Sequence, residues 1–162
     1  MLFEVNLAAD ARGWADPTVQ IGDAGLKMTA SYLTDALGEL LQALMSLVNG
    51  SLITECEWTQ EPGGWRWEFR RPDEAAVDLV IAFKEDAYTQ PWISIESAQV
   101  RLQERLPLTE VIEAITAGSR RCFEQWGLSG FAEQWDEHPF PLLQLKALER
   151  WLDDRVPAPL YA

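Results

Sequence analysis

The chain has 162 residues, of which 48% are hydrophobic and eight are tryptophan. It also carries 26 acidic and 13 basic side chains, which give a formal net charge of -13 at pH 7. A chain of this length and apolar content is expected to fold as one domain and to bury about two-thirds of its unfolded surface. The negative charge argues against nucleic acid and anionic membranes as partners and favours basic proteins.

Neither the N-terminus nor the rest of the chain indicates export or membrane insertion. Residues 1–5 contain no basic side chain of the kind that opens a signal peptide. No apolar run approaches the roughly 20 residues that span a bilayer. We therefore expect a cytoplasmic protein. Cys56 and Cys122 fall on the apolar faces of expected elements, so we expect two buried, reduced thiols, with a disulfide as the alternative.

The first third of the chain predicts two strands and a helix. Alternating apolar residues predict a strand over 2–8 and a second strand over 26–29 that pairs with it. Between them, residues 9–24 are rich in Ala, Asp and Gly and are predicted to form a loop. Leucines at helical spacing predict a helix over 32–49.

The middle of the chain predicts an antiparallel meander over residues 52–58, 65–70 and 77–83. In each segment large apolar residues occupy alternate positions, and in the first two segments charged residues stand between them, so one face of the sheet is expected to be aromatic and the other charged. Opposite charges on the outer face are expected to form ion pairs, each contributing well under about 1 kcal/mol. The residues expected to pair there are Glu55, Glu57, Glu68, Arg66 and Arg70.

The last part of the chain predicts one more strand and two helices. Residues 92–102 alternate with a change of parity, which indicates a bulge near Glu96-Ser97 or a switch to helix. Helices are predicted over 109–126 and 141–153, and residues 156–162 form an extended tail. The whole chain, 1–162, is thus expected to be one α+β domain. Its antiparallel sheet would have about five or six strands, with about three helices packed mainly on one face.

Several small or polar residues are expected to set the helix ends. Ser31 or Thr34 is predicted to cap the first helix, and Gly50 to end it in a left-handed conformation. Thr109 is predicted to cap the second helix and Gly127 to end it. Gly118, inside that helix, indicates close packing, because a mid-helix glycine otherwise costs about 1 kcal/mol relative to alanine.

No arrangement of residues predicts a catalytic or metal site. The single histidine, His138, precedes a proline and has no second ligand at a metal-binding spacing. Neighbouring acids such as Glu85-Asp86 diverge in helix or strand, which makes them poor acid-base pairs. No cofactor, metal or catalytic residue is therefore assigned, and an enzyme is less favoured than a binding protein. An enzyme using carboxylates or a metal in a cleft of the fold stays an alternative.

The partner-binding residues are expected among exposed acids and one aromatic anchor. They are acids of the 9–24 loop, outward glutamates of the first meander strand, a glutamate in the following turn, and a tryptophan that could fill a partner's pocket. These residues are Asp10, Trp14, Asp16, Asp23, Glu55, Glu57 and Glu61.

Two segments resemble small acidic bacterial proteins of unassigned function, of the toxin-immunity type. The run from Glu57 to Trp67, with the turn Glu61-Pro62-Gly63-Gly64, is similar to a hairpin of those proteins, and Gly127 to Pro141 is similar to their C-terminal part. The resemblance implies a cytosolic binding protein, such as an immunity protein that neutralises a basic toxin, for instance a nuclease. A structural subunit of a homo-oligomer is the other alternative.

Overall fold

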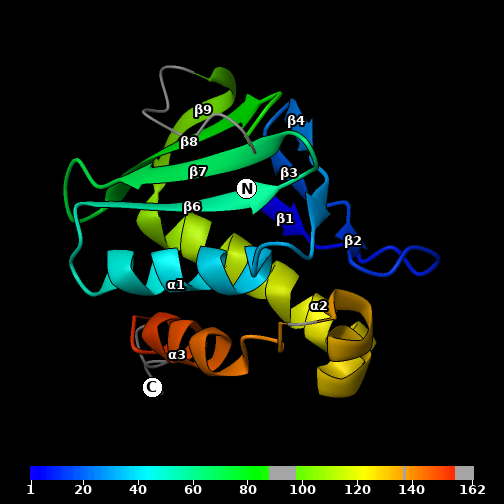
Figure 1. Cartoon of the computed structure of the whole chain (residues 1–162). Coiled ribbons are helices and arrows are strands. Elements are labelled where there is room, and N and C mark those ends of the chain that lie inside the picture. Colours follow the sequence, from blue (N-terminus) through cyan, green and yellow to red (C-terminus); the bar gives the residue numbers. More distant parts are fainter. Residues whose placement is uncertain (88–97, 137, 156–162) are drawn as a thin grey trace.

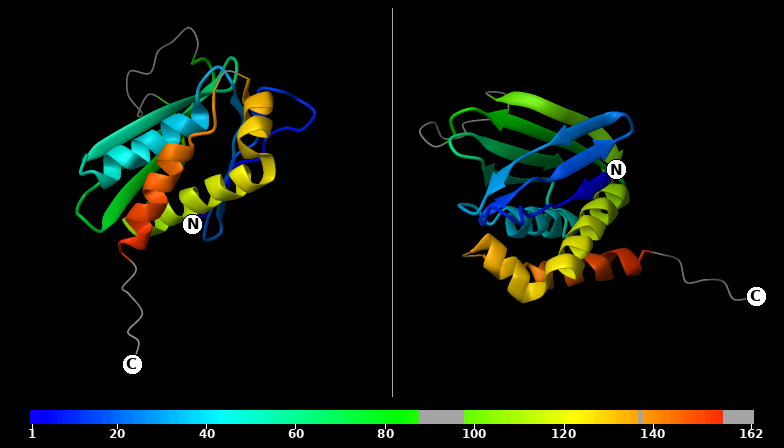
Figure 2. Two further views of the ribbon diagram at one scale, coloured as in Figure 1. Left: turned by 90° about the horizontal axis from the view of Figure 1, so that it is seen from below. Right: turned by 90° about the vertical axis from the view of Figure 1, so that its right-hand side faces the viewer.

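The computed structural model describes residues 1–87, 98–136 and 138–155. It consists of antiparallel sheets with three helices, so the predicted α+β class is confirmed (Figure 1). All three helices lie on one side of the largest sheet (Figures 1 and 2). The predicted strand over 92–95, the bulge at Glu96-Ser97 and the tail 156–162 lie outside the described residues.

The largest sheet contains the predicted three-strand meander and a fourth strand that extends beyond the predicted segment 92–102. Its four strands are β6 (Ile53–Thr59), β7 (Gly64–Arg70), β8 (Ala76–Lys84) and β9 (Gln99–Pro107), in the order β6-β7-β8-β9. Every neighbouring pair is antiparallel. The register between β8 and β9 shifts at Ile81/Ala82, so the described residues hold an irregularity near Arg101.

Aromatic side chains fill the inner face of this sheet. Trp67 is fully buried, and its ring centre lies 4.9 Å from that of Trp58 and 6.0 Å from that of Phe3. The Phe3 and Trp67 rings meet edge to face. This arrangement stabilises an aromatic pair in addition to the stabilisation that comes from burying its apolar surface. The alternation in the sequence therefore correctly predicts which face of the sheet lies against the core.

The outer face carries paired charges. The Arg66 guanidinium donates to the carboxylates of Glu55 and Glu57 on the neighbouring strand, and the Arg66–Glu57 distance is 3.3 Å. Arg70 bonds to Glu68 within its own strand. The cross-strand pairs of Arg66 confirm the prediction, whereas Arg70 and Glu68, which were expected to pair across strands, pair within β7. A further bidentate pair joins Arg105 to Asp78 at 2.6 and 2.9 Å.

The helices form two layers beneath the sheet. α1 (Ala36–Val48) runs along β6, and α2 (Leu108–Trp135) crosses beneath the sheet toward the N-terminal strands (Figure 1). α3 (Leu142–Asp153) packs on α1 and α2. Each buries leucine, isoleucine or aromatic side chains of one face, as the helical periodicity predicts.

The N-terminal segment differs from the prediction. Three short strands, β1 (Leu2–Glu4), β3 (Thr18–Ile21) and β4 (Ala24–Lys27), form one sheet in the order β1-β3-β4. β2 (Trp14–Ala15) and β5 (Ala30–Ser31) form a two-stranded sheet. The strands of the described residues thus divide among three sheets rather than forming one of five or six.

Two corrections follow from these strands. The predicted loop over 9–24 contains β2 and β3, and β1 pairs with β3 rather than with the strand expected over 26–29. The physical reason is a tight hairpin: Gly22 adopts a left-handed φ of 55°, and the residues before it alternate in burial. The many small and acidic residues of this segment masked the short strands.

The helix ends also differ in part. Asp35, not Ser31 or Thr34, caps α1, and its carboxylate accepts a hydrogen bond from the Gly38 amide at 3.1 Å. Gly50 has the predicted left-handed conformation, with φ 104°. α2 begins after Pro107, whose fixed φ suits a helix start, so Thr109 is not its cap.

Gly127 ends the first helical run of α2, as predicted, because its φ of 61° and ψ of -170° are not helical. A second helical run, which the sequence analysis did not predict, follows this kink and reaches Trp135. Gly118 confirms the predicted close packing, because a Cβ at this position would clash with the backbone oxygen of Phe3 in β1. Cys56 and Cys122 are buried free thiols, as expected. Among the described helices, none combines the length and apolar character that a membrane span needs.

Candidate partner-binding groove

The outer edge of β6 defines the candidate site. Leu52 and Gln60, at the two ends of the strand, bond to residues of the β7 side through Arg71 and Gly63. Backbone groups alternate in direction along a strand, so the odd-numbered residues of β6 direct their N–H and C=O groups away from β7. The free edge of the sheet therefore consists of the backbone groups of Ile53, Glu55, Glu57 and Thr59.

The start of α1 covers one half of this edge. The Thr59 amide donates to the Thr34 hydroxyl oxygen at 3.1 Å, and the Glu57 amide donates to a Glu39 carboxylate oxygen at 3.4 Å. Two side chains on the helix side thus replace the strand that the edge lacks. This is how the protein protects the C-terminal half of β6 from pairing with another chain.

The other half of the edge is open. Within the described part of the chain, the amides of Ile53 and Glu55 have no hydrogen-bond partner. Ile53 is 56% exposed, and Leu52, just before the strand, is 70% exposed. An open edge beside exposed apolar side chains is a surface that can accept an extended segment.

A shallow groove of about 680 Å³ lies between this half of β6 and α1. Figure 1 shows the two elements side by side, with α1 along the lower edge of β6. We call it the α1–β6 groove. It is lined by Asp35, Gly38, Glu39, Gln42, Ala43, Ser46, Ser51, Ile53, Thr54, Glu55 and Gln144.

Three carboxylates, those of Asp35, Glu39 and Glu55, line the groove, and Glu57 lies next to them on β6. Asp35 and Glu39 stand one helical turn apart at the start of α1, and Glu55 and Glu57 follow one another on the same face of β6. Arg66 forms ion pairs with both strand glutamates. The helix acids lie at the positive end of the α1 dipole, which stabilises their charge in part. The sequence analysis missed Asp35 and Glu39.

Two of these acids have a raised pKa. Partial burial raises the pKa of Glu39, the hydrogen bond from Glu57 opposes this, and the charges of Asp35 and Glu57 raise it further. Partial burial also raises the pKa of Glu57, against the lowering effect of Arg66. Of these four acids, only Glu55 and Glu57 form ion pairs among the described residues, and both pair with Arg66, so an incoming cation would meet carboxylates that no ion pair neutralises.

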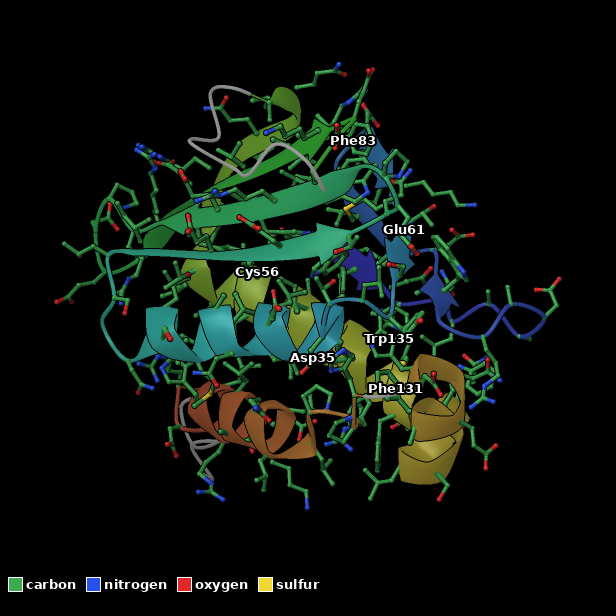
Figure 3. The ribbon with its side chains drawn as sticks, in the orientation of Figure 1. Asp35, Cys56, Glu61, Phe83, Phe131 and Trp135 are labelled. Atoms are coloured by element: carbon green, nitrogen blue, oxygen red, sulfur yellow. The ribbon has the colours of Figure 1, made fainter. Side chains whose placement is uncertain are left out.

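The structure brings together only some of the residues predicted to bind a partner. Glu55 and Glu57 lie at the groove, and Glu61 lies in the turn beyond the C-terminal end of β6 (Figure 3). Asp10 lies in the exposed loop between β1 and β2, which projects from the far end of the molecule relative to Ile53 (Figures 1 and 2). Asp23 occupies the turn between β3 and β4.

Two of the predicted residues are engaged inside the N-terminal segment. The Asp16 carboxylate lies 3.3 Å from the Lys27 ammonium and accepts a hydrogen bond from Thr29 at 3.1 Å. Trp14 is half-buried in β2, where it pairs with Ser31. Trp14 is thus part of a small sheet and only partly available as an aromatic anchor.

The sequence contains part of the information needed to find Asp35 and Glu39. Asp35 and Glu39 are spaced to share one face of a helix, opposite the buried leucines. Which strand that face meets depends on the contact between Glu39 and Glu57, 18 residues apart in the chain. No periodicity in the sequence encodes this contact.

The described residues contain no group of three or more side chains that could hold a metal ion. The imidazole Nε2 of His138 lies 3.0 Å from the Tyr32 backbone oxygen, which ties the histidine to the segment before α1. The groove thus offers carboxylates, amides and hydroxyls for recognition.

No protein-family model matches the chain, and no curated protein matches it. A chain of a solved structure, the CdiA-CT/CdiI toxin and immunity complex from Enterobacter cloacae, is similar over 74% of this chain and 99% of its own length. The TM-score is 0.48 and the sequence identity 8%. A likeness of this degree identifies neither a family nor an activity.

Proposed function

We propose that this protein is a binding domain for a basic protein partner, held at the α1–β6 groove. The observation that carries the proposal is the coincidence of excess negative charge with an open sheet edge. On the outer face of the meander, Arg70 pairs with Glu68 and Arg105 pairs with Asp78. At the groove, by contrast, Asp35 and Glu39 form no ion pair among the described residues.

The negative charge of the protein would raise the rate at which a basic partner associates with it. A net charge of -13 attracts a basic partner over a Debye length of about 8 Å at physiological salt. Such steering raises association rates to as much as about 10⁸ M⁻¹s⁻¹ at low salt. Asp10 and Asp23, which are exposed in a loop and a turn of the N-terminal segment, would contribute to this long-range field without touching the partner.

We propose further that the partner is a toxin and that binding neutralises it. The support is the resemblance of the β6–β7 hairpin and of the C-terminal segment to small acidic proteins of the toxin-immunity type. A basic nuclease fits this chemistry, because a surface that binds phosphates is cationic and an acidic protein can occupy it. Neutralisation would then follow from covering that surface.

Affinity capture followed by reconstitution tests this function. The full chain, immobilised, is used to capture partners from bacterial extract, and each captured protein is purified and bound again at several salt concentrations. We expect a basic protein whose affinity falls steeply with salt and whose toxicity on expression is abolished by co-expression of this chain. A partner that stays toxic in the saturated complex would overturn the immunity role. Salt-independent binding would overturn the electrostatic one.

A further inference from the structure

We infer that the groove takes its partner as an added β-strand: an extended segment bearing lysine or arginine pairs with the open half of β6. This inference rests on the proposed function and specifies how the partner is held. Backbone hydrogen bonds to Ile53 and Glu55 would supply the affinity, and alternate side chains the specificity.

The edge geometry supports strand addition at this place. Thr34 and Glu39 satisfy the amides of Thr59 and Glu57, so an added strand cannot pair there without displacing them. The next two outward positions, Ile53 and Glu55, are free among the described residues and border a groove of about 680 Å³. The available edge therefore starts where the helix contacts end.

The charges at the edge select a basic strand over a second copy of this chain. Two copies paired through β6 would bring Glu55 and Glu57 of one copy beside those of the other, and like charges placed opposite one another destabilise a sheet. A lysine or arginine opposite Glu55 would instead share its carboxylate with Arg66. The exposed side chains of Leu52 and Ile53 offer apolar contact to the intervening residues of the added strand.

A peptide of defined chemistry provides the test. The probe is a synthetic peptide of alternating lysine and valine, and the readout is residue-resolved amide hydrogen exchange of the full chain. We expect the amides of Ile53 and Glu55 to exchange at least about tenfold more slowly with the peptide bound, as one new hydrogen bond each would give. The control is the same peptide with every backbone nitrogen methylated, which keeps the charge and removes the donors.

Two substitutions at one position separate backbone from side-chain effects. Ile53→Pro removes an edge amide that is not part of the β6–β7 ladder, at the first residue of the strand, where proline is tolerated. Ile53→Ala removes the same side chain and keeps the amide. We expect Ile53→Pro to bind the peptide about tenfold more weakly than Ile53→Ala. Thermal unfolding of both variants reports whether the fold is kept.

Three results would overturn strand addition. They are equal binding of the methylated and unmethylated peptides, unchanged exchange at Ile53 and Glu55 in the bound state, and no binding of the peptide. Slow exchange at both amides without peptide, in a protein that sediments as a dimer, would assign the edge to a second copy. None of these outcomes affects the captured basic partner, so docking by charge alone would survive the failure of this inference.

Discussion

Glu39 illustrates how a single residue links the sheet edge to the charge of the groove. Partial burial, together with the charges of Asp35 and Glu57, raises the pKa of Glu39 above the ordinary 4.5. The hydrogen bond that its carboxylate accepts from the Glu57 amide, and to a smaller extent His138, oppose this shift. A raised carboxyl pKa means that the folded protein binds the proton more tightly than the unfolded chain. Stability is therefore lost as the pH rises from the ordinary pKa through the raised one.

The substitution Glu39→Gln isolates this effect. Glutamine keeps an acceptor for the Glu57 amide and removes the charge, so the variant should gain stability relative to the wild type as the pH rises from about 4.5 to 7. The measurement is the free energy of unfolding in urea at a series of pH values. Glu113→Gln, at an exposed position of α2, is the matched control. The same pH trend in both variants would contradict the assignment.

The two thiols are a second prediction at this scale. Burial raises the pKa of Cys56, and it raises that of Cys122 to about 12. Because the thiolate is the reactive form, we expect both to resist a maleimide reagent in the native protein at pH 7. Labelling should accelerate only at urea concentrations that unfold the chain. Fast labelling of either thiol without urea would show that it is accessible.

At the scale of the elements, α2 can cross β1 only because residue 118 is glycine. We expect Gly118→Ala to destabilise the protein by about 1–3 kcal/mol, since the added methyl group meets the Phe3 backbone oxygen. Gly130→Ala, where the new Cβ makes ordinary contact with Trp126, should instead stabilise α2 by up to about 1 kcal/mol. Thermal unfolding of the two variants compares them, and destabilisation of equal size would disprove the close crossing.

Thr34 makes a further prediction about the covered half of β6. Thr34→Val keeps the shape of the side chain and leaves the Thr59 amide without its acceptor, which should cost about 1–2 kcal/mol in the free energy of unfolding. The amide of Thr59 should then exchange faster with solvent. An unchanged exchange rate at Thr59 would show that α1 does not close this half of the edge.

How far the sequence predicts these elements depends on the length of their patterns. The meander strands alternate over seven to nine residues and were predicted with their inner and outer faces. β2 and β5, with two residues each, are too short for any periodicity to appear. Of the acids at the groove, the sequence analysis named those of β6, Glu55 and Glu57. The other half depends on a contact between α1 and β6 that only the folded chain creates.

At the scale of the whole molecule, the position of the charge matters more than its total. On the outer face of the meander Arg70 pairs with Glu68 and Arg105 with Asp78. At the groove a single arginine, Arg66, pairs with both Glu55 and Glu57, and Asp35 and Glu39 form no ion pair among the described residues. A partner attracted by the overall field would thus be retained where backbone groups are also free. The proposed function thus assigns two roles, long-range steering to all exposed acids and short-range holding to the groove.

The association rate of the captured partner with two charge-matched variants tests the central claim most directly. One variant carries Asp35→Asn, Glu39→Gln and Glu55→Gln, and asparagine preserves the cap of α1. The other carries Asp10→Asn, Asp16→Asn and Asp23→Asn, which remove the same charge from the N-terminal segment. By stopped flow at low salt we expect the groove variant to associate about tenfold more slowly than the wild type and the N-terminal variant to change much less. An association rate for the groove variant equal to that of the wild type, or a larger loss in the N-terminal variant, would contradict the groove as the binding site.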